Sequence, residues 1–83
     1  MQPIKLKCNA IHYRKGFIEI WPGIHEGCIN IEAWDIDSNL DISELEFAHV
    51  PESAITGNTE LELDLKTAQA LVDALQSAIK GLS

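Results

Sequence analysis

Positive charge is missing from most of this sequence. No Lys or Arg occurs in the fifty residues between Lys15 and Lys66, although those residues hold twelve of the thirteen acidic side chains. Binding of nucleic acid depends on Lys and Arg that neutralise phosphates, so a chain of net charge -7 is not expected to bind nucleic acid directly. An acidic surface instead suits a metal cation or a basic protein partner, which its potential would attract.

Several other features are scarce, and each scarcity excludes a class of protein. Two cysteines, Cys8 and Cys28, are too few for a disulfide framework, so we expect them to be reduced. No apolar run reaches the roughly 18 residues that span a bilayer, and the N-terminus lacks the apolar core of a signal peptide. No glycine-rich phosphate loop or nucleophile elbow occurs. We therefore expect a cytoplasmic protein that is not an enzyme and has neither catalytic residues nor a membrane partner.

The chain is also short. Its 83 residues make a single domain, 1–83, which can bury only roughly 60 to 65 per cent of its unfolded surface. Such a domain is marginally stable alone, so we expect a homodimer.

Alternating apolar residues predict three strands at the N-terminal half, over 4–13, 17–21 and 28–34. A hairpin turn at Gly16 would pair Tyr13 with Phe17, and the next loop would pair Trp21 with Cys28. One face is then apolar and includes Ile4, Leu6, Cys8, Ala10, Ile18, Ile20, Ile29 and Ile31. The other face carries Tyr13, Phe17, Trp21 and Trp34 with Lys5, Lys7, Glu19 and Glu32. We expect either the segment 37–58 or a second subunit to cover that aromatic face, unless it binds a partner.

The C-terminal half predicts two more strands and a helix. Residues 45–50 suit a short strand that Pro51 ends, 56–58 suit a turn, and 59–63 alternate as a strand. Asp64 is a good N-cap and Gly81 a good stop for an amphipathic helix. Its apolar stripe is Leu65, Ala68, Leu71, Val72, Leu75, Ile79 and Leu82. The predicted fold class is α+β: an antiparallel meander of about four strands with one C-terminal helix packed on one face.

The stretch DIDSNLDISELEF, residues 35–47, resembles the calcium-binding loop of an EF-hand. The resemblance implies calcium ligands at Asp35, Asp37, Asn39, Asp41 and Glu46, with Ser43 at the water-bridged position. Leu40 stands where the loop needs a left-handed glycine, which costs about 1 to 2 kcal/mol for a residue with a Cβ. The flanking residues also predict a strand before the loop. The alternative is a solvated connection anchored in the core by Leu40, Ile42, Leu45 and Phe47.

Two weaker site patterns involve cysteine and histidine. Cys8, His12, His25 and Cys28 have the composition of a zinc site, but residues four apart on a strand lie roughly 13 Å apart. A nucleophile built from Cys28 and His25 lacks nearby positive charge to activate the thiol. Neither pattern predicts a working site.

The C-terminal strand and helix, ELELDLKTAQALVDALQSAIKGL, are similar to the tails of many small phage and bacterial orphan proteins. Charge and size favour a protein-interaction module that engages a basic partner, and one version is an inhibitor similar to small acidic anti-CRISPR proteins. It would occupy the nucleic-acid-binding surface of a protein complex as a nucleic-acid mimic. The expected contact residues are Glu26, Glu32, Asp35, Asp37, Asp41, Glu44 and Glu46, with Trp21 and Trp34 as apolar anchors. A calcium-binding domain and a structural subunit of a larger assembly are the alternatives.

Overall fold

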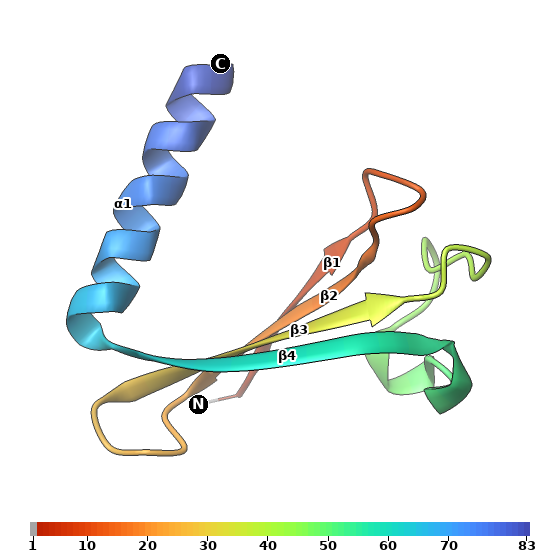
Figure 1. Cartoon of the computed structure of the whole chain (residues 1–83), viewed down its shortest axis with the longest axis horizontal. Coiled ribbons are helices and arrows are strands. Elements are labelled where there is room, and N and C mark those ends of the chain that lie inside the picture. The colour runs from red at the N-terminus through yellow and green to blue at the C-terminus, as the bar shows by residue number, and fades with distance from the viewer. Residues whose placement is uncertain (1) are drawn as a thin grey trace.

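A four-stranded antiparallel sheet followed by one helix makes up the computed structural model, which describes residues 2–83 (Figure 1). The strands lie in the order of the chain, β1-β2-β3-β4, as a meander. The elements are β1 Ile4–Cys8, β2 Gly16–Pro22, β3 Cys28–Ile36, the 3-10 turns η1 Phe47–His49 and η2 Glu52–Ala54, β4 Ile55–Asp64 and α1 Leu65–Leu82. The predicted α+β fold class is confirmed.

The strand registers differ from the predicted ones by an even number of residues. β1 ends at Cys8, and Ile4 pairs with Ile20, so the predicted tight hairpin at Gly16 is wrong. In the next pair Trp21 lies opposite Asn30 rather than Cys28. Because side chains alternate with a period of two, an even shift leaves the residues that remain in strands on their predicted faces. The strands therefore share an isoleucine face, made by Ile4, Leu6, Cys8, Ile18, Ile20, Ile29, Ile31, Ala33, Leu61 and Leu63.

The segment before β4 was mispredicted in two places. Residues 47–49 form a 3-10 turn instead of a short strand, and the expected turn at 56–58 lies inside β4. The strand passes close to Asp35 of the neighbouring strand at Gly57, where a Cβ would lie only 2.7 Å from Oδ2 of Asp35. A glycine therefore fits at this position of β4. A β-bulge at Asp35 and Ile36 absorbs the register change at the same end of the sheet.

The core lies on the aromatic face, at the end of the sheet away from α1. Phe17, Ile36, Ile42 and Ala54 are buried there, and Ile42 has no exposed surface. The half-buried residues packed around them are Trp34, Leu40, Leu45, Phe47, Val50 and Ile55. Of the two coverings expected for this face, the segment after β3 provides one at this end of the sheet, with Leu40, Ile42, Leu45 and Phe47 as its anchors. Tyr13, expected on the same face, instead lies in the β1–β2 loop and is exposed.

The helix α1 begins where the sequence predicts and ends one residue later. The Asp64 carboxylate accepts a hydrogen bond from the Thr67 backbone N–H at 2.7 Å, as an N-cap does, and the helix continues through the predicted stop at Gly81. It packs only weakly on the sheet, through β4 and β3. Figure 1 shows α1 rising from the end of β4 and standing clear of the strands along most of its length. Among residues 2–83 no helix has the length and hydrophobicity required to cross a bilayer.

Candidate functional site

Carboxylates form a row on the aromatic face of the sheet, the face opposite the isoleucine face. Glu19 on β2 lies opposite Glu32 on β3, which in turn lies opposite Glu60 on β4. Neighbouring strands are about 4.8 Å apart, so three acidic residues occupy three successive strands in one line. Glu62, two residues along β4, extends the group on the same face. We call Glu19, Glu32, Glu60 and Glu62 the sheet carboxylates.

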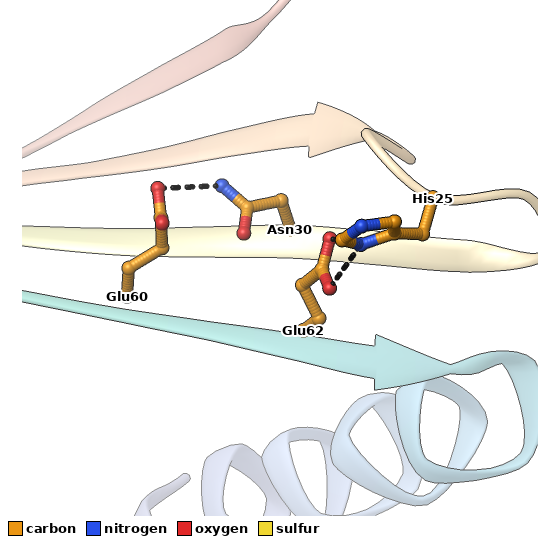
Figure 2. Close-up of polar contacts among 4 residues, drawn as sticks. All are labelled: His25, Asn30, Glu60 and Glu62. Atoms are coloured by element: carbon orange, nitrogen blue, oxygen red, sulfur yellow. Dashed lines mark hydrogen bonds and ion pairs between the residues drawn. The ribbon is translucent and has the colours of Figure 1, made fainter.

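Asparagine and histidine side chains orient most of these carboxylates. The Asn58 amide donates to Glu32 at 3.0 Å, and the Asn30 amide donates to Glu60 at 3.2 Å. His25 from the β2–β3 loop contacts both carboxylate oxygens of Glu62 through Nδ1, at 2.6 and 2.8 Å (Figure 2). An amide donor fixes the direction of a carboxylate without cancelling its charge.

Cations compensate only one end of the row. Lys5 on β1 lies 3.6 Å from Glu19, and that carboxylate also accepts a hydrogen bond from the Trp21 indole at 2.7 Å. The other ion pair within residues 2–83 is His25 with Glu62, which is charged only when His25 is protonated. Glu32 and Glu60 thus have no cationic partner in the described chain. The row is least compensated at its β3 and β4 end.

Asn30, which lies opposite Glu62 on the same face, is a buried polar residue. Only 1% of its surface is exposed, and its Oδ1 has no hydrogen-bond donor, while its amide donates to Glu60 (Figure 2). A buried acceptor without a donor carries an energetic cost. The Asn30 amide thus has an acceptor in Glu60, while its Oδ1 has no donor within residues 2–83.

The two tryptophans expected as partner anchors lie in different surroundings. Trp21 is 38% exposed at the end of β2, and its indole N–H is directed to Glu19. Trp34 is half-buried and packs against Phe47 with ring centroids 5.2 Å apart. Trp21 is therefore available to a partner beside the sheet carboxylates, whereas Trp34 contributes to the core.

The remaining predicted contact residues lie away from this row. Glu26 is exposed in the β2–β3 loop. A second group, which we call the loop carboxylates, lies at the end of β3 and in the segment after it. Its members are Asp35, Asp37, Asp41, Glu44 and Glu46. The acidic block of the sequence is thus divided between two regions of the fold.

The EF-hand-like stretch takes a different conformation from a calcium loop. Asp35 is still part of β3, Asp37 Oδ1 accepts the Asn39 backbone N–H at 2.9 Å, and Asp41 accepts from both the backbone and the hydroxyl of Ser43. Leu40 has a negative φ, like every other non-glycine residue in 2–83. The hydrogen bonds from Ser43 lower the pKa of Asp41 below its usual value. The carboxylates therefore cap local turns rather than converge on one point.

No group of three or more His, Cys, Asp or Glu side chains in residues 2–83 is arranged to hold a metal ion. Cys8 and Cys28 are free thiols. The His25 imidazole contacts Glu62, and the hydrogen bond between His25 and Cys28 joins only their backbones. The cysteine and histidine patterns of the sequence thus form no shared site.

The expected contact residues did not include five residues of this site: Glu19, Asn30, Asn58, Glu60 and Glu62. The alternation of Glu60 and Glu62 with Leu61 and Leu63 was visible, but their position beside Glu32 depends on how β4 pairs with β3. An asparagine in a strand was a further signal, since asparagine is depleted there unless a specific contact holds it. Comparison with known proteins gives no guide to the role of these residues, because no family model, curated protein or solved structure matches this chain.

Proposed function

We propose that this chain is a non-catalytic protein-interaction module that binds a basic protein through the sheet carboxylates. The observation that carries the proposal is the direct opposition of Glu32 and Glu60, with no cation from residues 2–83 paired to either of them. Like charges on directly opposed strand positions destabilise a folded protein. A lysine or arginine of a partner would relieve that repulsion on binding.

The surroundings of the carboxylates fit such a partner. Amide donors hold Glu32 and Glu60 in place before binding, so little side-chain freedom is lost when a cation arrives. The exposed Trp21 provides an apolar anchor next to the charged group. Lys and Arg side chains of a partner would supply further donors to the carboxylate oxygens of Glu32 and Glu60.

The partner class we favour is a nucleic-acid-binding protein or complex. Its basic groove is built to meet closely spaced negative charges, about one per 3.4 Å along each strand of a duplex. Glu32 and Glu60 offer one uncompensated charge on each of two neighbouring strands, about 4.8 Å apart, whereas Glu19 on the next strand is buried and paired with Lys5. The chain would then act as an inhibitor that occupies the groove in place of the nucleic acid, as a phage-encoded anti-CRISPR protein does in general terms.

Affinity capture with three immobilised proteins tests this proposal. The first is the unaltered chain, the second carries Glu32→Gln, Glu60→Gln and Glu62→Gln, and the third carries Glu44→Gln, Glu46→Gln and Glu52→Gln. All three substitutions in each variant keep the side-chain size and remove three charges. We expect a partner from the native host to bind the first and third proteins and to be lost from the second. Equal retention by all three would overturn the role of the sheet carboxylates.

Calcium binding at 35–46 is the second candidate, and the resemblance to the EF-hand loop is what favours it. The turns capped by Asp37 and Asp41 would have to open to form the loop. Calorimetry with calcium decides the matter, because a working loop binds in the millimolar range or tighter. Heat of binding that disappears in Asp37→Asn would establish this candidate, and its absence at millimolar calcium would remove it.

A further inference from the structure

The isoleucine face and the apolar stripe of α1 are both partly open to solvent, with Ile18, Ile20, Ile29 and Ile31 half-buried at the centre of the face. On the sheet, Leu61 is 62% exposed, and Ile4 and Leu6 are about half exposed. On the helix, Leu75 is 55% and Ile79 64% exposed. The core of the chain lies on the opposite face of the sheet, so it covers neither surface. Apolar surfaces of this extent on a small protein mark an interaction site.

The dimensions of the chain indicate how much surface is left uncovered. The chain exposes 6331 Å², whereas a compact monomer of its mass, 9.2 kDa, exposes about 4,900 Å². Its radius of gyration is 14.2 Å, compared with about 12 Å for a compact domain of this length. The excess is about 1,400 Å² per chain. Two chains that buried this excess would share about 2,800 Å², which is the size of an obligate homodimer interface.

The junction between β4 and α1 is direct, and the helix packs only weakly on its own sheet. β4 ends at Asp64 and α1 begins at Leu65, with no connecting residue between them. Connections between strands and helices normally take about 2 to 6 residues. Asp64 is also held in its extended conformation by the capping hydrogen bond to Thr67. The direction of α1 is therefore set at the junction, away from the sheet of the same chain.

The helix itself needs a surface to pack on. Its apolar residues follow spacings of three and four, at Leu65, Ala68, Val72, Leu75, Ile79 and Leu82, and none of its residues is buried. An isolated helix of 18 residues is marginal in water, because most helical stability in proteins comes from packing. The helix is about 27 Å long, which is enough for it to cross all four strands of a sheet.

We propose that two copies of this chain form a dimer in which each α1 lies across the isoleucine face of the other copy. This arrangement is isologous, and it covers both open surfaces of both chains at once. Pairing of the two helices alone would leave the isoleucine faces in water, and pairing of the two sheets alone would leave the helical stripes in water. The sheet carboxylates lie on the opposite face, so the dimer presents two copies of the site proposed above.

Light scattering after size-exclusion chromatography gives the first test. The unaltered chain should have the mass of two chains at micromolar concentration, and its helical circular dichroism signal should fall on dilution as the dimer dissociates. A monomeric mass at high micromolar concentration would overturn the proposal. The isoleucine face would then belong to a different protein partner.

Two variants and their mixture test the exchange itself. A helix variant carries Leu75→Glu and Ile79→Glu, and a sheet variant carries Leu6→Lys and Leu61→Lys. All four side chains are exposed in the single chain. Each variant alone should be monomeric, with the mass halved, because charged groups would enter an apolar interface. Mixed together, they should recover a dimer of one copy each, since one helix and one face are unaltered and the altered pair is Glu against Lys.

The other possible arrangements give different results and would each overturn the proposal. If the sheet variant alone stays dimeric, the helices pair with each other. If the helix variant alone stays dimeric, the sheets pair with each other. A matched control, Gln76→Glu with Ser77→Glu, adds two charges to the solvent side of α1 and should remain a dimer. Glu32→Gln with Glu60→Gln should also remain a dimer, so loss of the carboxylate site and loss of the dimer are separable.

A measurement on the unaltered chain avoids any question of whether the variants fold. A dimer mixed from isotope-labelled and unlabelled copies allows nuclear Overhauser effects between the two copies to be selected. We expect contacts between the methyl groups of Leu75 and Ile79 in one copy and those of Ile18 and Ile31 in the other. Contacts only between helix and helix, or none between copies, would contradict the exchange.

Discussion

Glu32 and Glu60 lie directly opposite each other on β3 and β4, and neither has a cation beside it within residues 2–83. Each is instead held by an asparagine amide, Glu32 by Asn58 and Glu60 by Asn30. The chain thus places two like charges at directly opposed strand positions. Opposite charges at such positions stabilise a sheet, and like charges destabilise it. A surface of this kind is poorly suited to stabilising the isolated protein and well suited to receiving a cationic side chain.

The opposition of Glu32 and Glu60 predicts a stabilising substitution. Glu60→Gln keeps an oxygen acceptor for the Asn30 amide and removes the repulsion, so the free energy of unfolding should rise by about 0.5 kcal/mol. Urea denaturation at low ionic strength measures this change, and the gain should shrink in high salt. Glu44→Gln, in the exposed loop, is the matched control and should have little effect. A loss of stability in Glu60→Gln would contradict the account of an uncompensated pair.

The core under the aromatic face predicts a strongly destabilising substitution. Ile42 has no exposed surface and packs with Phe17 and Ile36. Ile42→Ala should therefore lower the free energy of unfolding by about 2 to 5 kcal/mol, which is a large part of the stability of a small domain. Leu40→Ala, at a half-buried position of the same segment, should cost less. If the two variants were equally stable, the segment after β3 would not be packed as described.

The N-cap of α1 predicts a dependence of helix content on pH. The hydrogen bond from the Thr67 backbone N–H lowers the pKa of Asp64 below its usual value of 3.8. A lowered pKa in the folded state means that the stabilisation is present above the unfolded pKa and is lost as the pH falls through the folded pKa. Asp64→Asn keeps a capping oxygen but cannot titrate, so it should remove this part of the acid transition. Circular dichroism of both proteins from neutral to acidic pH measures the difference, and identical curves would show that the cap does not titrate with the helix.

The alternation of apolar and polar residues was enough to predict which face of the sheet each strand residue occupies. It did not predict which residue lies opposite it on the neighbouring strand. Trp21 pairs with Asn30 instead of Cys28, yet the isoleucine face is unchanged because the shift is even. The register depended on loop conformations that the sequence specifies weakly, such as residues 9–15, which turn before β2 without a tight hairpin. For the same reason Glu32 was recognised as a candidate, whereas Glu60 and Glu62 were not.

The position of α1 relative to the sheet was the other feature that the periodicity of the sequence could not predict. The apolar stripe of the helix predicted a surface that must be covered, and the isoleucine face predicted a matching one. A helix folded back over its own sheet is the simplest solution for such a pattern, and it requires a connection that the chain does not have after Asp64. The direct junction after Asp64 is thus the local feature from which we propose that the two surfaces meet between two copies of the chain.

The most direct test of the proposed function is the salt dependence of partner binding. The captured partner should be titrated calorimetrically with the unaltered chain and with the variant that carries Glu32→Gln, Glu60→Gln and Glu62→Gln, each at low and high sodium chloride. If these carboxylates bind cationic side chains, the affinity of the unaltered chain should fall steeply with salt, and the variant should bind weakly at both concentrations. An affinity that is the same for both proteins and insensitive to salt would contradict the account.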